Sequence, residues 1–430
     1  MNTTKTLPAA VERYLEETDK RLAHHPKLQQ VFRNCFPNTL ETTTKLLDDG
    51  TTFVYTGDIP AMWLRDSVEQ VRHYIPLAKD DADLQRIIEG LIARQLFYIN
   101  IDPYTNAFNE TANGRHYRDS DDCELSPWMW ERKYELDSLC FPVQLLAQYW
   151  QATGRTSMFD DDCYRALSSV VRVIATEQRH DEKSPYFFRR DTKQDTETLY
   201  NDGRGMPTNY TGMSWSGFRS SDDACEFGYN IPANMFAVVI LGHIQRIASE
   251  IYKDEELAGR AAKLIKEINF GIQRYGIVDH PKHGKIYAFE TDGYGNFSLM
   301  DDAGTPGLLS IPYIGYVGTD DPIYQNTRRF ALSFDNPFYF EGKHAKGIGS
   351  PHTPGGYVWH MALSMQGLTS EDDQEIKDLI ETLLATDAGT GYMHEGFHPD
   401  DPSDFSREWF AWSNSLFATL VVKAMEKGLV

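Results

Sequence analysis

The sequence predicts an all-α fold in which paired helices close into a ring, an (α/α)6 barrel. Two observations predict it. Apolar residues recur at helical spacing along the whole chain and give roughly twelve helices. Tight turns and long loops then alternate between successive helices, as the pairing of helices in a ring requires. No low-complexity linker interrupts the chain, so we expect one domain over 1–430, with 1–25 as an N-terminal helical extension.

Local signals mark the beginning and end of several helices. The segment 84–100 has apolar residues at helical spacing. Gly154 lies just past the end of one helix, and Asp321 with Pro322 supplies the cap and the first residue of another. Ser370 is expected to cap a further helix. The predicted helices are 10–24, 64–76, 84–100, 134–153, 158–177, 228–252, 255–276, a segment near 318–332, 355–367, 371–385 and 409–426.

The long loops should gather at one end of the ring and form a pit. They hold most of the Gly, Pro, Trp and Tyr residues, and some short strands, such as 285–289, are expected among them. Aromatic side chains in such loops either stack on sugar rings or pin the loops to the barrel. The tryptophans in or beside loops are Trp63, Trp128, Trp130, Trp215, Trp359, Trp409 and Trp412.

The composition excludes several classes of protein. A formal net charge of -21 disfavours nucleic acid or an anionic membrane as a partner. Five cysteines without a CxxC pair argue against a disulfide scaffold. The N-terminus has no apolar signal-peptide core and we see no apolar run of about 18 residues, so we expect a cytoplasmic protein without a transmembrane helix. The oligomeric state is not predictable.

Two separated acidic segments carry the strongest chemical signal. The stretch 216–224 contains the adjacent carboxylates Asp222 and Asp223, and 392–397 contains Glu395, among Gly, Trp, Phe, His and Arg. Hydrolysis of a glycosidic bond needs two carboxyl groups. The sequence therefore indicates a glycoside hydrolase, although the residues alone do not choose between Asp222 and Asp223.

Further polar residues in the loops are candidates for binding sugar hydroxyls. Arg65 and Asp66 open a helix, where they could grip a sugar or simply form a capping pair. Glu135 and Asp137 lie at the start of the predicted helix 134–153, where they could bind a sugar or simply interact favourably with the helix dipole. The acidic pairs at 301–302 and 400–404 lack calcium-loop spacing, so neither a metal ion nor a cofactor is expected. The predicted binding residues are Trp63, Arg65, Asp66, Glu135, Asp137, Arg204, Arg219, His352 and Trp412.

Four segments are distinctive when taken together: 56–67, 218–224, 393–397 and 409–414. They resemble glycoside hydrolase family 125, and the likeness runs from about residue 25 to the C-terminus. The resemblance implies an (α/α)6 barrel and an inverting exo-α-1,6-mannosidase that acts on mannose-containing oligosaccharides. By motif, the general acid falls on Asp222 and the general base on Glu395.

This mechanism requires a protonated acid. We expect burial and the neighbouring charge of Asp223 to raise the pKa of Asp222. Two alternatives remain: a sugar epimerase or isomerase on the same barrel, using His352 or His394 as acid and base, and a non-catalytic glycan-binding protein.

Overall fold

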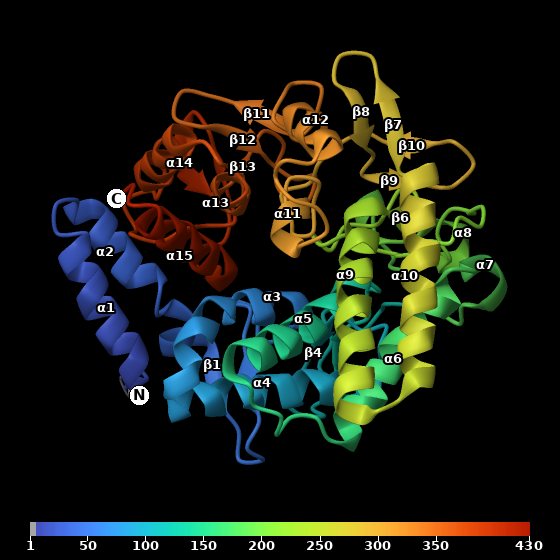
Figure 1. The fold of residues 1–430 in the computed structure, drawn as a ribbon. Coiled ribbons are helices and arrows are strands. Elements are labelled where there is room, and N and C mark those ends of the chain that lie inside the picture. Colours follow the sequence, from blue (N-terminus) through green and yellow to red (C-terminus); the bar gives the residue numbers. More distant parts are fainter. Residues whose placement is uncertain (1–5) are drawn as a thin grey trace.

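Helices build most of the computed structural model, which describes residues 6–430, and short strands lie in the loops between them (Figure 1). The α-helices are α1 (Ala9–Arg21), α2 (Pro26–Cys35), α3 (Leu64–Glu69), α4 (Ala82–Ile101), α5 (Leu136–Thr153), α6 (Asp161–Glu177), α7 (His180–Lys183), α8 (Tyr200–Gly203), α9 (Ile231–Ile247), α10 (Glu255–Tyr275), α11 (Ile311–Ile314), α12 (Pro322–Ala331), α13 (His360–Leu368), α14 (Asp373–Ala385) and α15 (Ala411–Glu426). The 3-10 and π segments are η1 (Thr39–Thr43), η2 (Arg72–Asp80), η3 (Asp195–Glu197) and η4 (Ala248–Tyr252).

The helices surround a common centre in two alternating sets (Figure 1). In the inner set, α3 contacts α5, α5 contacts α9, α9 contacts α11, α13 contacts α15, and α15 contacts α3. Partners lie outside them: α10 packs on α9, α14 on α13, and α4 on α5. The predicted pairing of successive helices is therefore present, and the first and last parts of the chain meet where α2 contacts α15.

The predicted helix ends are confirmed at two places and corrected at a third. Gly154 ends α5 with φ of 70°, and Asp321 caps α12 by accepting from the Tyr324 N–H. Ser370 does not cap α14. Asp372 does so, because its carboxylate accepts from two backbone N–H groups of the first turn, while the Ser370 hydroxyl donates to the Glu375 carboxylate.

Two predicted helices are shorter than their apolar pattern. The 64–76 segment breaks after Glu69, and η2 continues it from Arg72 with Pro76 inside. The predicted 355–367 helix begins at His360, because the preceding residues pair as a strand. Conversely α2 was not predicted, although Pro26 occupies its first position, where proline is favoured.

Within residues 6–430, six small antiparallel sheets hold the loops. Their orders are β1-β2, β3-β4-β5, β10-β9-β6, β7-β8, β11-β12 and β13-β14-β15, and β8 confirms the extended segment predicted near 285–289. The strands are β1 (Thr44–Leu46), β2 (Thr52–Val54), β3 (Met62–Trp63), β4 (Ala107–Phe108), β5 (Met129–Glu131), β6 (Tyr229–Asn230), β7 (Ile277–His280), β8 (Gly284–Tyr287), β9 (Glu290–Thr291), β10 (Phe297–Ser298), β11 (Tyr339–Glu341), β12 (Lys346–Ile348), β13 (Val358–Trp359), β14 (Gly396–His398) and β15 (Asp401–Phe405).

The N-terminal helix α1 is joined to the rest of the molecule. It contacts α2 and η2, and the Ala10 N–H donates to the Asp81 carboxylate at 2.8 Å. Val11 and Leu15 are buried. The predicted extension therefore packs into the body from Ala9 onward, and its residues 1–5 lie outside the described part of the chain.

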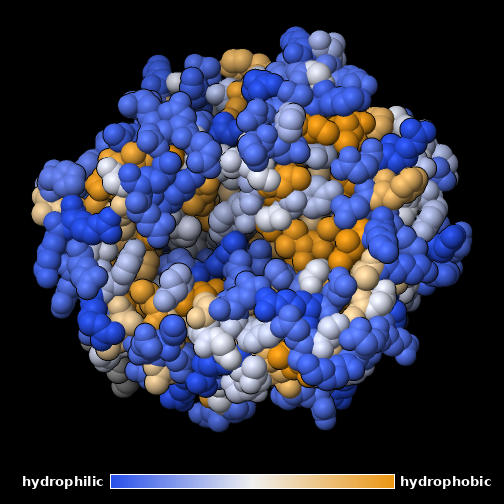
Figure 2. Space-filling view, viewed as in Figure 1, coloured by the Kyte–Doolittle hydropathy of each residue, from blue (hydrophilic) through white to orange (hydrophobic). Residues whose placement is uncertain are grey.

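One helical stretch, Ile231–Tyr252, is long and apolar enough to cross a membrane by its length and composition alone. It comprises α9 with η4, and most of its apolar part is buried inside the molecule. It packs against α5, α10 and α11, as a core helix does. Elsewhere the face in Figure 2 is mostly hydrophilic, with apolar patches between the helices.

Candidate active site

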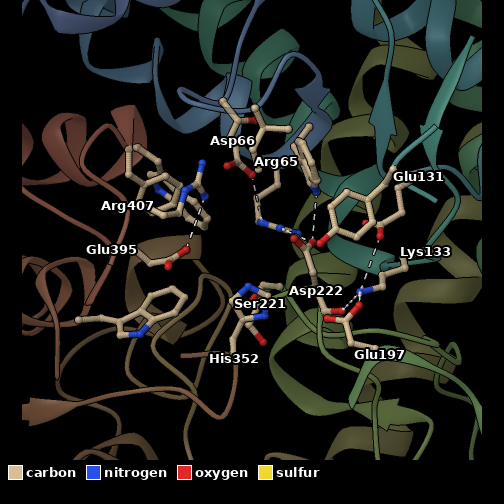
Figure 3. A pocket seen from close by; sticks show the side chains of 18 residues that line it. Arg65, Asp66, Glu131, Lys133, Glu197, Ser221, Asp222, His352, Glu395 and Arg407 are labelled. Carbon is tan, nitrogen blue, oxygen red and sulfur yellow. Dashed lines mark hydrogen bonds and ion pairs between the residues drawn. The ribbon is translucent and has the colours of Figure 1, made fainter. Parts of the chain in front are cut away.

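A pit opens among the loops, and side chains from distant parts of the chain line it (Figure 3). The three-stranded sheets β3-β4-β5 and β13-β14-β15 supply loop ends to it. Its lining is both aromatic and acidic, which suits the apolar faces and polar edges of a sugar. The lining residues are Thr56, Ile59, Trp63, Arg65, Asp66, Tyr117, Glu131, Lys133, Glu197, Ser220, Ser221, Asp222, His352, Trp359, Glu395, Arg407, Phe410 and Trp412.

Arg65 is the central cation of the pit. It lies in the first turn of α3, directly after β3, and its side chain is buried. Its guanidinium contacts Glu135 Oε2 at 2.5 Å and Asp222 Oδ1 at 3.0 Å, and Asp137 Oδ2 lies 3.3 Å away. Asp66 lies beside it, with 3.6 Å between Arg65 Nε and Asp66 Oδ2.

Asp222 projects from a tight hairpin. Its φ is 68°, in the left-handed region that few residues other than glycine adopt. The Arg219 N–H donates to the Asp223 carbonyl at 2.7 Å, and the Asp222 N–H donates to the Arg219 carbonyl at 3.0 Å. Lys133 Nζ donates to the Asp222 carbonyl at 2.8 Å. These contacts fix the direction in which the carboxyl group points.

The charges around Asp222 act against the pKa that we expected from the sequence. Burial is the largest influence and raises the pKa of this carboxyl, but the charge of Arg65, the hydrogen bond with Glu135 and the charges of Lys133 and His352 together outweigh it, so the pKa of Asp222 lies below its ordinary value. Burial and the Asp222 carboxylate instead raise the pKa of Glu135 well above its ordinary value. The expectation that Asp222 itself has the raised pKa is therefore wrong.

Asp223 has a different partner from its neighbour. Its Oδ1 lies 3.0 Å from His352 Nδ1, and its side chain is buried. Burial opposes the charge of His352, but the hydrogen bond and the charge of Asp223 raise the pKa of the imidazole to about 9. Since Asp223 is bound to a cationic His352 and does not line the pit, Asp222 is the better candidate for the acid.

Glu395 faces the pit from the side opposite Asp222 (Figure 3). It directly precedes β14, whose pairing with β13 and β15 fixes its backbone. Ser406 Oγ donates to Oε2 at 3.1 Å, and Arg407 Nη1 lies 3.5 Å from Oε1. Arg407 also pairs with Asp58. Glu395 is thus held by a hydroxyl and a cation, as an ionised carboxylate requires.

Some polar atoms at the pit remain without a hydrogen-bond partner among residues 6–430. They are Arg65 Nε, Asp66 Oδ2, Trp412 Nε1 and Thr56 Oγ1, all buried on residues that line the pit. Buried polar groups in folded proteins are nearly always satisfied, so an unsatisfied cluster at a cavity indicates a ligand with several polar groups. A sugar is such a ligand.

The structure separates the predicted binding residues into three groups. Trp63, Arg65, Asp66, His352 and Trp412 line the pit together with both predicted carboxyls. Glu135 and Asp137 lie behind Arg65 and do not line it.

The third group lies elsewhere. Arg204 donates to the carbonyls of His180 and Ser184, and Arg219 pairs with Glu290 at 2.6 Å. Neither guanidinium lines the pit, because each is used to hold a loop in place.

Four charged residues of the pit were not predicted: Glu131, Lys133, Glu197 and Arg407. Lys133 contacts Glu197 at 3.3 Å, on the side of Asp222, and Arg407 contacts Glu395. Their positions in the sequence could have indicated them, because Lys133 follows the Trp-rich segment 128–131 and Arg407 lies two residues before Trp409. Such charges look like ordinary surface residues until the fold brings them to the pit.

One trio near the pit has the spacing of metal ligands. Ligand atoms of Glu197, Asp223 and His352 lie within 4.8 Å of one another. However, Lys133 and Arg190 already pair with Glu197, and the protonated His352 has no free lone pair to offer. The group is therefore better described as a network of ion pairs than as a metal site.

Two carboxyl groups oppose each other across a pit with aromatic walls, inside a ring of helices. This arrangement is typical of a glycoside hydrolase. The family model for metal-independent α-mannosidases, glycoside hydrolase family 125, matches residues 25–422. The chain belongs to this family and is an α-mannosidase.

Known relatives agree. A structure of a metal-independent α-mannosidase from Streptococcus pneumoniae, in a non-productive complex with α-1,6-mannobiose, is 47% identical with a TM-score of 0.95, covering 97% of this chain and 98% of that one. The meiotically up-regulated gene 157 protein of Schizosaccharomyces pombe is 41% identical over 97% of this chain and 86% of its own length. A bacterial glucoamylase with acarbose shares the fold alone, at 13% identity and a TM-score of 0.56 over 85% of this chain and 49% of that one.

Proposed function

We propose that this α-mannosidase is exo-acting, that it removes a non-reducing terminal α-1,6-linked mannose with inversion, and that its helices form an (α/α)6 barrel. The observation that carries the reaction is the pair Asp222 and Glu395, which face each other across one pit. The Streptococcus pneumoniae relative that binds α-1,6-mannobiose supports the linkage. The ring of alternating helices and the shared fold with a glucoamylase support the barrel.

In this proposal Asp222 is the general acid. It transfers its proton to the glycosidic oxygen as the C1–O bond breaks. Glu395 removes a proton from a water molecule, whose oxygen attacks C1 from the opposite face, so the sugar leaves with inverted configuration. Ser406 and Arg407 stabilise Glu395 as the carboxylate that must accept this proton.

Other residues of the pit would bind the terminal sugar. Trp412 Nε1 is placed to bond its hydroxyl groups, and so are Arg65 Nε and Asp66 Oδ2, which contact each other only at 3.6 Å and make no hydrogen bond within residues 6–430. The exposed ring of Tyr117, at the pit, would then meet the next residue of the oligosaccharide.

The two alternatives are less favoured by the contacts. An isomerase needs a histidine that can gain and lose a proton at neutral pH. His352 is held as a cation by Asp223, and His394 is buried between Thr390 and the Arg407 carbonyl, away from the pit. A binding protein has no need of two carboxyls opposed across the ligand.

Incubation with α-1,6-mannobiose tests the proposal. We expect free mannose as the product, and slower or no release from α-1,2- and α-1,3-mannobiose. An isomerised disaccharide would favour the isomerase, and unchanged ligand would favour the binding protein. The double variant Asp222→Asn/Glu395→Gln is the matched control for contaminating mannosidase.

A further inference from the structure

Four carboxyl groups surround the single guanidinium of Arg65. Asp66 comes from the same helix, Glu135 and Asp137 come from the start of α5, and Asp222 comes from the hairpin. The side chains of Asp66, Glu135 and Asp137 are 5%, 0% and 1% exposed. One cation cannot balance three buried negative charges together with that of Asp222, whose side chain is 22% exposed, because the desolvation of each buried carboxylate costs several kcal/mol unless a charge compensates it.

Glu135 and Asp222 share two hydrogen-bond donors, although Ser138 Oγ also donates to Glu135 Oε2 at 2.7 Å. Arg65 donates to Glu135 Oε2 through Nη1 and to Asp222 Oδ1 through Nη2. Asn106 Nδ2 donates to Glu135 Oε1 at 3.1 Å and lies 3.5 Å from Asp222 Oδ1. Asp137 shares only Arg65 with Asp222. Glu135 and Asp222 are therefore the two carboxyls that are coupled most directly.

The donors also show where a proton on Asp222 would be. Trp63 Nε1, Arg65 Nη2 and Asn106 Nδ2 all approach Oδ1, at 3.2, 3.0 and 3.5 Å. An oxygen that accepts from three N–H groups does not carry a proton of its own. Oδ2 is therefore the atom of Asp222 that can carry and deliver a proton.

Lys133 and His352 also favour the charged form of Asp222, but they compensate the excess of negative charge only in part, because each has other partners. Lys133 is committed to Glu131, Glu197 and the Asp222 carbonyl. His352 is paired with Asp223, and Arg407 pairs with Asp58 and Glu395.

We propose that Glu135 and Asp222 hold one proton between them, and that Glu135 is the positioning residue which retains this proton in the pit until Asp222 delivers it. The inference rests on the proposed role of Asp222 as the acid. The raised pKa of Glu135 and the lowered pKa of Asp222 agree with a proton that rests on Glu135. Two like-charged carboxyls that share a site cannot both ionise readily.

The proton balance of one turnover is complete. The proton of the pair goes from Asp222 Oδ2 to the glycosidic oxygen as the C1–O bond breaks, and the pair becomes doubly negative. Water gives its hydroxyl to C1 and its proton to Glu395. Glu395 then releases this proton to solvent, and the pair takes one proton from solvent to restore the resting state.

The pH dependence of kcat/KM tests the inference. In the wild type, the basic limb reports loss of the shared proton. Glu135→Gln removes the carboxyl that is coupled most directly to Asp222 and frees a donor of Arg65, so we expect the basic limb to move to lower pH by about one unit or more, with activity recovered in acid. Glu135→Asp, which keeps a carboxyl, should keep the limb near its wild-type position.

The matched control is Asp137→Asn, which removes another contact of Arg65 and should shift the limb less. A basic limb that stays in place in Glu135→Gln, or moves no further than in Asp137→Asn, overturns the proposal.

A second measurement does not depend on the folding of Glu135→Gln. The infrared difference spectrum of wild type minus Asp222→Asn at neutral pH should contain the band of a protonated carboxyl. In Asp222→Asn the neutral side chain no longer repels a charged Glu135, so Glu135 ionises and the band is present only in the wild type. No such band overturns the shared proton. Failure of the proposed function has another signature: Asp222→Asn would keep its activity on α-1,6-mannobiose.

Discussion

At the scale of single residues, the strained backbone of Asp222 explains how a carboxyl can be aimed at one bond. A left-handed conformation in a non-glycine residue costs about 1–3 kcal/mol and persists only where its surroundings impose it. Here the hairpin hydrogen bonds and Lys133 impose it. Asp223, one residue further on, points at His352 instead. Two adjacent and chemically identical side chains therefore have different roles.

The first prediction concerns the two opposed carboxyls. Asp222→Asn and Glu395→Gln should each lower kcat by about 10²–10⁴-fold, the usual contribution of a general acid or base. Steady-state rates on α-1,6-mannobiose measure this, with circular dichroism to show that the fold is intact. Near-normal activity in either folded variant contradicts the assignment. If Asp223→Asn is the inactive variant and Asp222→Asn is not, the acid is Asp223.

The second prediction concerns His352 and stability. Its pKa in the folded protein is about 9, above the 6.5 of an unfolded histidine. A raised folded pKa means that the folded state binds the proton more tightly, so this stabilisation is complete below pH 6.5 and is lost as the pH rises through about 9. The difference in Tm between wild type and His352→Gln should therefore be largest near pH 6 and shrink toward pH 10.

Asp223→Asn provides the control for that prediction. Removing the carboxylate removes the cause of the raised pKa, so this variant should lose the same pH dependence as His352→Gln. A Tm difference that is equal across the whole pH range would mean that His352 stabilises only by packing.

At the scale of elements, short strands decide where the reactive side chains point. The hairpin of Asp222 is tied to β9, because Arg219 pairs with Glu290 at 2.6 Å, and Glu290 also accepts from the N–H groups of Glu226 and Phe227. Tryptophan has a similar role nearby: Trp215 is buried, with its ring stacked on His180 at 3.5 Å. It pins a loop, while Trp63 and Trp412 line the pit.

The third prediction follows from this anchor. Arg219→Ala leaves the buried carboxylate of Glu290 without its cation, so urea unfolding should show a loss of about 3–5 kcal/mol. Arg219→Ala/Glu290→Gln should recover part of that loss, because the unpaired charge is gone. An unchanged free energy of unfolding together with a raised KM would instead support direct contact between Arg219 and the sugar.

At the scale of the whole molecule, the sequence predicted the helical architecture better than the identity of the site residues. Long helices such as α10 have strong periodicity and clear caps, so their bounds differ from the prediction by a residue or so. The 64–76 segment failed because an apolar pattern does not reveal the break between Glu69 and Arg72.

Site residues that belong to a recognisable sequence motif were predicted. Site residues that reach the pit only through the folding of distant loops were not. Asp222, Glu395 and Arg65 stood out in the sequence and meet at the pit. The roles of Lys133 and Arg407 depend on contacts between loops that are far apart along the chain, which no local pattern encodes. Arg219 looked like a ligand for the same reason, since the sequence does not show that Glu290 faces it.

The last prediction is stereochemical and depends on how the ring holds its two acids apart. Asp222 and Glu395 come from opposite sides of the pit (Figure 3), and Ser406 and Arg407 fix Glu395 on its own side. An inverting enzyme needs room for water between the carboxyls, about 6.5–9.5 Å, whereas a retaining enzyme brings them to about 5–5.5 Å and forms a covalent intermediate. We therefore expect β-mannose as the first product from an α-linked substrate.

Proton NMR of the anomeric region in the first minutes, before mutarotation, measures which anomer of mannose forms first. Glu395→Gln, which is expected to release no mannose of either configuration, controls for background hydrolysis. An initial α-mannose signal would keep the enzyme a mannosidase but would make Glu395 a nucleophile rather than a base.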